Sequence, residues 1–464
     1  MTTMQRTLSP VDGSVYVERA VADVAAINRT LDAGVAAQRQ WAATSLADRI
    51  AVLSRAVDAF VAEGPAIALE ISWQMGRPIA HSPGEIRGFE ERARHMLATA
   101  EESLAPIRPT PRDGFERKIK RVPLGVVAVV APWNYPYLTA VNAVIPALAA
   151  GNSVVLKHSH QTPLCAERFA QAFASAGLPE GVFSYLHLSH ADTATLMGDP
   201  RVAHVCFTGS VEGGRAVVAA TGRGFATAGL ELGGKDPAYV RADANLAHAI
   251  DSLADGAFFN AGQSCCGIKR IYVADSLYDA FVEGVVAFAH AYRLGSPIEA
   301  DTTLGPVVRT SAADWIRRQV ADASARGARQ LVDETRFAAS RAGTPYLAPQ
   351  VLVDVDHSIP FMREESFGPA VGIMRVSSDE EAVRLMNDSD FGLTAAVYTG
   401  DPGAGEHIGD QLQTGTVFVN RCDYLDPALA WTGVKNSGRG CTLSRVGYEQ
   451  LTRPQSFNIR ISTT

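Results

Sequence analysis

The sequence predicts an α/β protein whose centre is an open, doubly wound sheet of mostly parallel strands. Two observations predict it. Beyond residue 125, short runs rich in Val, Ala and Leu alternate with segments of helical spacing. These runs are apolar at successive positions, so both of their faces should be buried, which is typical of parallel sheets covered by helices. The alternation resumes after residue 232, so we expect a second α/β domain.

The first βαβ unit is predicted over residues 125–157. A strand at Gly125–Ala131 leads through a turn at Pro132–Pro136 into an alanine-rich helix that ends at Gly151, and a strand follows at Ser153–Lys157. The crossover should be right-handed. The same pattern then predicts a helix at Gln161–Ala176, a strand at Val182–Leu188, a helix at Ala191–Met197 and a strand at Val202–Thr208. This is a Rossmann-like domain, an architecture that binds nucleotides beyond the carboxyl ends of its strands.

Segments outside this unit complete the predicted architecture. Helical spacing at Val21–Gly64 and Ala66–Ala100 predicts layers packed on the sheet. Apolar residues alternate with charges at Arg112–Val122, which predicts a β-hairpin arm outside the core, and Ser456–Ile461 predicts a terminal strand. Edge strands of this kind suit pairing between subunits, so we expect a homo-oligomer.

In the second α/β domain, strands are predicted at Tyr272–Val273, Val351–Val355, Val371–Val376 and Val417–Asn420. We assign residues 1–102 and 124–232 to the nucleotide-binding domain. Residues 233–445 form the second α/β domain, and residues 103–123 and 446–464 form a small β oligomerisation arm.

Composition is typical of an ordered globular protein. The chain has 464 residues, 47% of them hydrophobic and 20% charged, and it is too long for one core. The net charge of −7 means that the chain has no excess of positive charge for binding a phosphate backbone, so we expect no nucleic-acid partner. The polar stretch Met1–Val15 lacks the pattern of a secretory signal, and six cysteines are too few for a disulfide scaffold. We therefore expect a cytoplasmic protein with reduced thiols.

One stretch, Val122–Leu156, contains no charged residue, so a membrane span is the alternative to a buried soluble core. Pro and Gly residues divide the stretch into pieces shorter than the ~20 residues that a spanning helix needs. We interpret it as core and expect no membrane association.

Four short motifs contain candidate reactive groups. Cys265 lies in Asn260-Ala-Gly-Gln-Ser-Cys265-Cys266, and Glu231 ends a predicted strand beside a double-glycine turn. Asn134 lies in the loop Ala131-Pro-Trp-Asn-Tyr-Pro136, and the turn Phe207-Thr-Gly-Ser210 joins a strand to a helix. Taken alone, each has a structural explanation, such as a buried cysteine or a rigid loop. A Gly-Gln turn leading Cys265 into a helix N-terminus would lower the pKa of the thiol and expose its sulfur.

Together, the order and composition of these motifs resemble the aldehyde dehydrogenase superfamily along nearly the whole chain. Further matching motifs are Val154-Val-Leu-Lys157, Glu364-Glu365-Ser-Phe367-Gly-Pro369 and Gly433-Val-Lys-Asn-Ser-Gly-Arg-Gly440. The resemblance implies the aldehyde dehydrogenase fold, with residues 233–445 as the catalytic domain. It also implies NAD(P)-dependent oxidation of an aldehyde to a carboxylate.

The resemblance assigns three catalytic residues, and each suits the chemistry. Cys265 as thiolate would add to the carbonyl carbon. The side-chain amide of Asn134 and the backbone N–H of Cys265 would stabilise the oxyanion. Hydride loss then leaves a thioester, which Glu231 would hydrolyse by activating water as general base. The presence of Glu231 favours hydrolysis over transfer of the acyl group to coenzyme A, and we interpret Cys266 as part of the pocket wall.

The resemblance also implies contacts with NAD or NADP. These carry over to Val130, Trp133, Lys157, His160, Phe207, Gly209, Ser210, Leu232, Glu365 and Phe367. NAD-preferring relatives often have a carboxylate where this chain has His160, so NADP is also admissible. His158 and His160 would point to one side of an extended segment and suggest a metal ion, but no third ligand is evident and we predict no metal.

Position by position, the aldehyde tunnel would be lined by Tyr135, Thr139, Asn142, Phe259, Ser264, Tyr424 and Trp431. Four of these seven are aromatic, which favours an aryl or medium alkyl aldehyde. The alternatives are an aminoaldehyde, bound by Asp423 and Asp426, and a semialdehyde, whose carboxylate Arg421 would bind.

Two other classes of function remain open from sequence. A non-catalytic binding protein could retain the fold, although it would have little reason to keep Cys265, Glu231 and Asn134 together. A nucleotide-independent thiol esterase could use Cys265 with the same oxyanion site.

Overall fold

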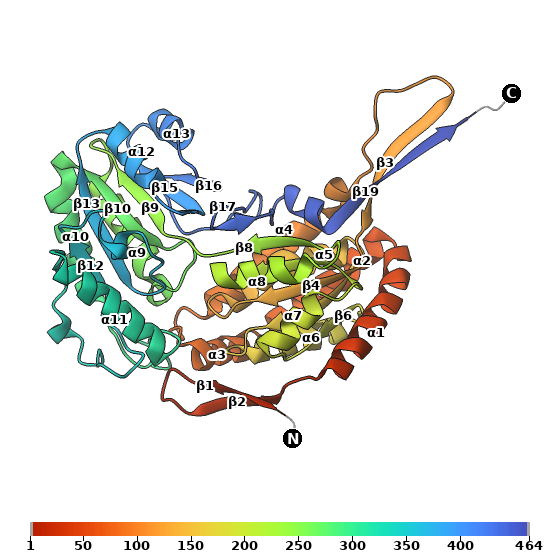
Figure 1. Ribbon diagram of the computed structural model, residues 1–464, viewed down its shortest axis with the longest axis horizontal. Helices are drawn as coiled ribbons and strands as arrows, with labels where there is room; N and C mark the ends of the chain where they lie inside the picture. Colours follow the sequence, from red (N-terminus) through yellow and green to blue (C-terminus); the bar gives the residue numbers. More distant parts are fainter. Residues whose placement is uncertain (1–2, 462–464) are drawn as a thin grey trace.

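The computed structural model describes residues 3–461, and its centre is a six-stranded, mostly parallel sheet (Figure 1). Its strand order is β18-β8-β7-β4-β5-β6. The strands are β4 (Val126–Ala131), β5 (Ser153–His158), β6 (Phe183–Tyr185), β7 (Val202–Thr208), β8 (Thr227–Glu231) and β18 (Gly438–Arg439). Only β18 runs antiparallel to its neighbour. The predicted doubly wound sheet is therefore present.

One predicted strand of this sheet is too long. Val182–Leu188 was expected to be extended, but β6 covers three residues, which pair with Val154–Leu156 of β5. Beyond Tyr185 the chain leaves the sheet toward α7 (His190–Met197). As the last strand at this edge, β6 has no second neighbour that would hold residues 186–188 in the ladder.

Helices cover both faces of the first sheet. Residues Val127 and Val129 of β4 pack in one core with α5, whereas Val126 and Ala128 pack in another with α1, as the alternation of side chains along a strand requires. The helices around this sheet are α1 (Val24–Ala43), α2 (Leu46–Ala62), α3 (Gly64–Met75), α4 (Pro83–Leu104), α5 (Pro136–Ala149), α6 (Pro163–Ser175), α7 and α8 (Val211–Thr221). The two long segments of predicted helical spacing are thus four helices, divided by the Ser45 cap, by Gly64-Pro65 and by residues 76–82.

The second sheet has seven strands in the order β11-β12-β13-β10-β9-β15-β16. Its strands are β9 (Asp236–Val240), β10 (Ile268–Ala274), β11 (Arg329–Gln330), β12 (Gln350–Val353), β13 (Ala370–Val376), β15 (Thr394–Tyr398) and β16 (Thr416–Val419). Around it lie α9 (Leu246–Phe258), α10 (Tyr278–Ala291), α11 (Thr310–Ala325), α12 (Asp379–Asn387) and α13 (Pro402–Gly409). Every residue of β9 and β10 is buried. The prediction of a second α/β unit is confirmed.

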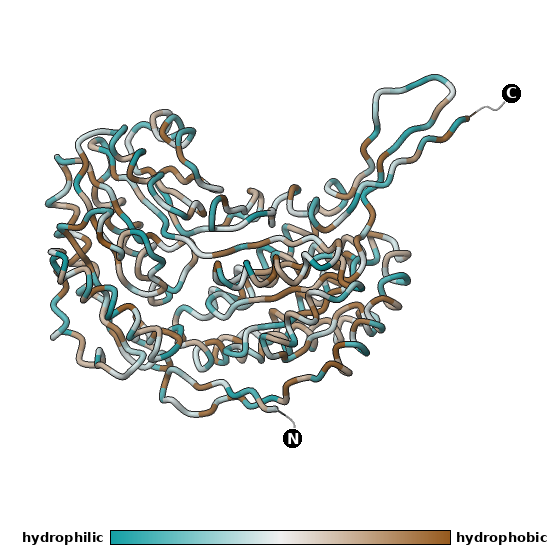
Figure 2. Tube along the Cα trace, in the orientation of Figure 1, coloured by the Kyte–Doolittle hydropathy of each residue, from teal (hydrophilic) through white to brown (hydrophobic). Residues whose placement is uncertain are grey.

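A two-stranded ribbon projects from the body of the molecule (Figure 1). It consists of β3 (Phe115–Pro123) and β19 (Thr452–Arg460), paired antiparallel over their whole length. The prediction of a local hairpin at Arg112–Val122 is therefore wrong, because the main partner of β3 is the C-terminal strand. Local sequence pattern carries no information on so distant a partner. Figure 2 shows hydrophilic and hydrophobic residues interspersed along the ribbon.

The N-terminus forms a hairpin that the sequence did not predict, β1 (Met4–Leu8) with β2 (Val15–Ala20). Two further short strands, β14 (Phe391–Gly392) and β17 (Val434–Lys435), pair with each other.

The segment after residue 430 returns to the first sheet. Trp431, Leu443, Tyr448 and Leu451 are buried in the core around α2, α4 and α5, and β18 pairs with β8. The domain bounds inferred from sequence stay a prediction, although part of residues 233–445 packs on the first sheet. Across residues 3–461, no helix has the length and apolar character needed to cross a membrane.

Candidate active site

A cavity of about 410 Å³ contains the two candidate reactive groups. Cys265 and Glu231 both line it, together with all seven residues expected at the aldehyde tunnel. Those seven are Tyr135, Thr139, Asn142, Phe259, Ser264, Tyr424 and Trp431. The volume lies in the range of small-molecule sites. The structure therefore brings together residues from four separate parts of the chain.

The loop that carries Asn134 is fixed by a buried ion pair. Arg77 Nη1 lies 2.5 Å from Glu85 Oε2, and both side chains are almost fully buried. Arg77 Nη2 also donates to the backbone carbonyl of Asn134 at 2.6 Å. The other Glu85 oxygen accepts from the backbone N–H groups of Tyr137 and Leu138, each at 2.9 Å. A carboxylate at the first turn of α5 satisfies donors that have no intrahelical partner.

The side chain of Asn134 points toward the cysteine loop. Its Nδ2 donates to the carbonyl of Gln263 at 3.1 Å, so one amide hydrogen is engaged and the second is not. Within residues 3–461, the backbone N–H of Cys265 donates to no protein acceptor. The two donors expected to stabilise an oxyanion therefore lie on adjoining loops, with hydrogen-bonding capacity left over.

Cys265 lies in a tight turn. It follows the short turn η1 (Phe259–Gly262), in which Asn260 and Ala261 have left-handed φ angles of 54° and 53°, and it precedes β10. The expectation of a helix N-terminus at the thiol is therefore wrong. Two glycines allow the loop to close. A Cβ on Gly262, whose φ is +66°, would lie 2.2 Å from the carbonyl oxygen of Gly368, and a Cβ on Gly234 would lie 2.3 Å from that of Cys265.

Glu231 ends β8 and is held by two hydroxyl groups. Thr442 donates to its Oε1 at 2.5 Å and Thr208 to its Oε2 at 3.1 Å. Burial raises the pKa of Glu231, while the two hydroxyls and the charge of Arg92 act in the opposite direction. The carboxylate is thus oriented, and it binds a proton more readily than an exposed glutamate does.

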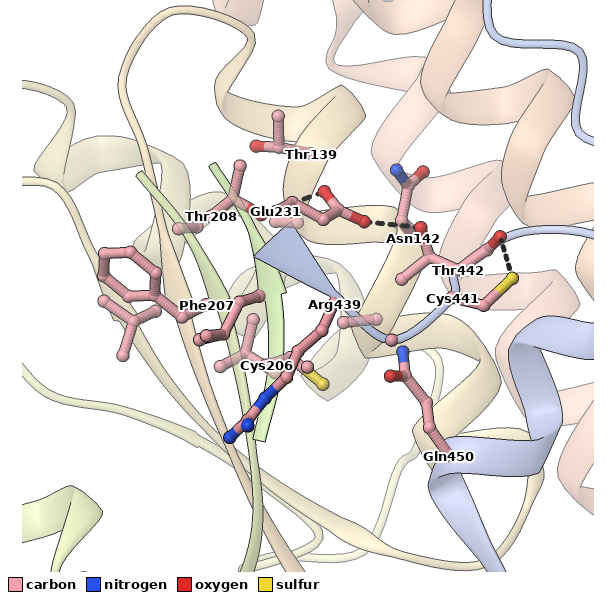
Figure 3. Close-up of a pocket in the computed structure, with 18 residues that line it drawn as sticks. Thr139, Asn142, Cys206, Phe207, Thr208, Glu231, Arg439, Cys441, Thr442 and Gln450 are labelled. Atoms are coloured by element: carbon pink, nitrogen blue, oxygen red, sulfur yellow. Dashed lines mark hydrogen bonds between the residues drawn. The ribbon is translucent and has the colours of Figure 1, made fainter. Parts of the chain in front are cut away.

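Behind Glu231 lies a second, much smaller cavity of about 20 Å³ (Figure 3). Glu231, Thr208 and Asn142 line both cavities. The amide oxygen of Gln450, which also lines the small cavity, is buried without a hydrogen-bond partner. The space is sufficient for one water molecule, which needs polar partners of this kind.

Cys266 is bound on the far side of the turn. Its thiol donates to Asp423 Oδ1 at 2.9 Å, and the Ser264 hydroxyl donates to the same oxygen at 3.0 Å. The neighbouring thiol of Cys265 and burial raise the pKa of Cys266 well above its usual range. Burial also raises the pKa of Asp423 to about 6.

Three of the residues expected to contact the cofactor lie side by side at the carboxyl ends of adjacent strands. Val130 is in register with Lys157 on one side and with Phe207 on the other. Lys157 is buried and its ammonium has no hydrogen-bond acceptor in the described chain, and burial lowers its pKa to about 8. Gly209 is required locally, because a Cβ there would lie 2.6 Å from the Phe207 ring.

Ser210 begins α8 and accepts from the N–H of Gly213. A helix N-terminus next to a glycine turn suits a pyrophosphate. Glu365 Oε1 accepts from the backbone N–H of Gly234 at 3.2 Å, and the ring of Phe367 lies edge-on to Trp133 with centroids 5.6 Å apart. Leu232 lies at the start of the glycine turn that contains Gly234. The backbone N–H of Leu232 donates to the carbonyl of Ser437.

The two histidines of the His158-Ser-His160 segment point in different directions. His158 is buried, with Nε2 bound to the Pro136 carbonyl and Nδ1 to the Thr162 hydroxyl. His160 lies beyond the end of β5, is exposed, and lines a separate cavity of about 690 Å³ with Arg309. The premise that they share one side is therefore wrong. Among residues 3–461, no three His, Cys, Asp or Glu side chains form a metal-binding group.

Comparison with known proteins agrees with this geometry. The model of a family described as "Aldehyde dehydrogenase family" matches residues 2–457. The chain belongs to the aldehyde dehydrogenase family. Membership confirms the fold class expected from sequence and the expectation of an enzyme that acts on aldehydes.

Several aldehyde dehydrogenases resemble the chain over nearly their whole length. The succinate semialdehyde dehydrogenase [NAD(P)+] Sad of Escherichia coli (strain K12) is 33% identical over 430 residues, which are 93% of this chain and 92% of that protein. The succinate-semialdehyde dehydrogenase [NADP(+)] 1 of Mycobacterium tuberculosis (strain ATCC 25177 / H37Ra) is 33% identical over 458 residues, 96% of this chain and 97% of that one. The structure of the Streptococcus pyogenes succinic semialdehyde dehydrogenase in complex with NADP+ superposes with a TM-score of 0.93 at 26% identity, covering 98% and 100% of the two chains.

The aldehyde dehydrogenase cavity also contains residues that sequence reasoning missed. They include Arg87, Glu91, Arg92, Leu138, Thr208, Asp255 and Leu425. Arg421, considered for a carboxylate, stacks over the Tyr424 ring at 3.6 Å, and neither it nor the exposed Asp426 lines the cavity. The residues of α4 carry no motif, and only their three-dimensional position next to α5 brings them to the cavity.

Proposed function

We propose that this chain catalyses NAD(P)-dependent oxidation of an aldehyde to a carboxylate through a thioester on Cys265, hydrolysed with Glu231 as general base. The observation that carries the proposal is the position of these two side chains in one cavity, next to the Asn134 loop. The names of relatives that use NAD(P)+ or NADP+ support either nucleotide as cofactor.

The residues present fit such a cofactor. A buried ammonium without an acceptor, that of Lys157, would bind ribose hydroxyls. The N-terminus of α8 at Ser210 would receive the pyrophosphate, and the Glu365 carboxylate would bind the nicotinamide ribose. When bound, the nicotinamide ring accepts the hydride.

In the first step, the Cys265 thiolate adds to the carbonyl carbon and forms a thiohemiacetal oxyanion. The Cys265 N–H and the Asn134 amide donate to this oxygen, which is a stronger interaction in the charged state than with the neutral carbonyl. The oxyanion collapses to the thioester as the hydride leaves the same carbon. One donor is a backbone N–H, and the Asn134 amide is held by the carbonyl of Gln263. Little reorganisation of these donors is therefore needed when the negative charge forms on the oxygen.

In the second step, Glu231 removes a proton from water, the hydroxide adds to the thioester, and the Cys265 thiolate leaves. The net change is aldehyde, oxidised nucleotide and water to carboxylate, reduced nucleotide and two protons. The hydroxyls of Thr442 and Thr208 keep the carboxylate in place between the substrate cavity and the small cavity behind it.

The experiment is absorbance at the reduced-nicotinamide band with a panel of aryl, alkyl, amino and carboxylated aldehydes, each with NAD and with NADP. We expect turnover by the wild type and none by Cys265→Ala. Hydrolysis of an activated ester without nucleotide, in a folded protein that oxidises no aldehyde, would favour the esterase alternative.

We also propose that the β3–β19 ribbon mediates assembly into a homodimer or homotetramer. Among residues 3–461, β19 has no second strand partner, and the outer edge of β3 is bridged only at Ile119, by Ile107, and at Phe115, by Arg112. The remaining unpaired backbone groups favour pairing with another copy. Sedimentation equilibrium measures the assembly, and a monomer at micromolar concentration would contradict this proposal.

A further inference from the structure

A single buried guanidinium lines the substrate cavity, that of Arg92 on α4. The residue is 8% exposed. Its Nη1 donates to the Leu138 carbonyl at 2.7 Å and to Asn142 Oδ1 at 3.3 Å. Within residues 3–461, Nε and Nη2 have no acceptor, and no carboxylate oxygen lies within 4.0 Å of the side chain.

A buried cation without a counter-ion is unfavourable, since proteins normally pair such charges. The carboxylates of Glu85 and Glu231, which are close enough to affect the Arg92 charge, have other hydrogen-bond partners. Glu85 is paired with Arg77, and Glu231 is held by Thr442 and Thr208. The free donors of Arg92 therefore indicate an anionic ligand in the cavity.

We propose that Arg92 binds a carboxylate at the far end of the aldehyde, so that the substrate class is short semialdehydes that carry a carboxylate. This rests on the proposed function and names its substrate. Guanidinium and carboxylate form paired, charge-assisted hydrogen bonds, which an uncharged aldehyde of the same length cannot replace. The aromatic residues that favoured an aryl or alkyl substrate would then enclose the short aliphatic chain.

The acidic residues of the cavity do not provide an equivalent site for a cation. Glu91 accepts from the Tyr424 hydroxyl at 2.8 Å, and Asp423 accepts from Cys266 and Ser264. Asp255 is exposed. Arg87, the other cation of the lining, is exposed too. Arg92 alone combines burial with unused donors.

A different role for Arg92 would act through the base. Its charge lowers the pKa of Glu231. Loss of that charge alone would therefore lower kcat for every aldehyde and move the acidic limb of the kcat–pH profile to higher pH. Binding of a substrate carboxylate predicts instead a loss that depends on the substrate and lies mainly in KM.

The experiment compares kcat/KM for 4-oxobutanoate, butanal and 4-(trimethylammonio)butanal, which differ in the charge at one end. The variants are Arg92→Met, Arg92→Lys and the control Arg94→Met, which removes an exposed arginine two residues further along α4. We expect the wild type to prefer 4-oxobutanoate to butanal. Arg92→Met should lower this preference about 10- to 100-fold, Arg92→Lys less, and Arg94→Met not more than twofold.

Equal losses for 4-oxobutanoate and butanal in Arg92→Met, or a wild-type preference for the cationic aldehyde, would overturn the inference while leaving the proposed oxidation intact. If the wild type oxidises no aldehyde, the proposed function fails first. Protection of Cys265 from iodoacetamide then still tests the anion site in the unaltered protein. We expect succinate to protect at a concentration at least tenfold below that of butyrate, and equal protection would refute the inference.

Discussion

The guanidinium of Arg77 lies against the backbone of Asn134 and donates to its carbonyl oxygen at 2.6 Å. The same group is paired with Glu85, which in turn binds the first turn of α5. One buried ion pair therefore fixes both the loop of the oxyanion donor and the helix that follows it.

Replacement of Arg77 by Met should remove one partner of this pair and leave the Glu85 charge buried. We expect a loss of about 3–5 kcal/mol in the free energy of unfolding, measured by urea denaturation, with a lower kcat in the protein that remains folded. The control is Arg326→Met, which breaks an exposed pair with Asp322 and should cost less than about 1 kcal/mol. Equal stability of the two variants would contradict this role.

Glu231→Gln should separate the two chemical steps. The amide cannot accept a proton, so we expect a burst of reduced nucleotide equal to the enzyme concentration, followed by turnover at least 100-fold slower. Rapid-quench mass spectrometry should detect the acyl group on Cys265. Absence of a burst together with unchanged steady-state turnover would exclude Glu231 as the base.

Thr442→Val should move the acidic limb of the plot of kcat against pH to higher pH. The base works as carboxylate, so activity falls as the pH falls through the pKa of Glu231, which burial raises above its ordinary value. The Thr442 hydroxyl lowers that pKa, and its loss raises the pKa further. The matched control is Thr195→Val on the surface of α7. The acidic limb of its kcat–pH profile should coincide with that of the wild type. A downward shift in Thr442→Val would contradict the assignment.

His160→Glu should favour NAD over NADP. A carboxylate next to Lys157 would accept from the ribose hydroxyls and repel a 2′-phosphate. We expect the ratio of the Kd for NADPH to the Kd for NADH to rise at least tenfold, measured by nucleotide fluorescence without any aldehyde. A ratio that does not change would place His160 outside the ribose site.

Iodoacetamide should modify Cys265 before Cys266. The raised pKa of Cys266 keeps it protonated near neutral pH, and its thiol is bound to Asp423. Peptide mass spectrometry at limiting reagent checks the order, and Cys266→Ala should retain one titratable thiol in the turn. Preferential labelling of Cys266 would require a different nucleophile.

Much of this arrangement could be predicted from sequence. The β4–α5–β5 unit follows from its apolar runs and Pro and Gly punctuation, and the motifs identify Cys265, Glu231 and Asn134 because those residues lie in short, continuous segments. The structure adds what local pattern does not encode. Arg92 and Arg77 have no surrounding motif, and their importance comes from hydrogen bonds to the carbonyls of Leu138 and Asn134, which lie 46 and 57 positions further along the chain.

Two of the wrong predictions have the same cause. The hairpin at Arg112–Val122 and the helix after Cys265 were inferred from neighbouring residues, whereas the partner of β3 is the strand β19 and the turn at Cys265 is shaped by contacts with Gly234 and Gly368. In both cases, contacts between residues far apart in the sequence determine the local structure.

The return of the C-terminal segment to the first sheet has a consequence for biosynthesis. Thr442 holds Glu231, β18 completes the sheet beside β8, and the Tyr448 hydroxyl binds the Met96 carbonyl inside the first core. These residues are synthesised after the other strands of both sheets. Until then, the nucleotide-binding layer exposes an unfinished edge and an open core, which are features that recruit chaperones. The enzyme should therefore become active only after residues 431–451 have been synthesised and packed, and a stop codon at position 431 should yield an aggregating protein rather than a smaller active one.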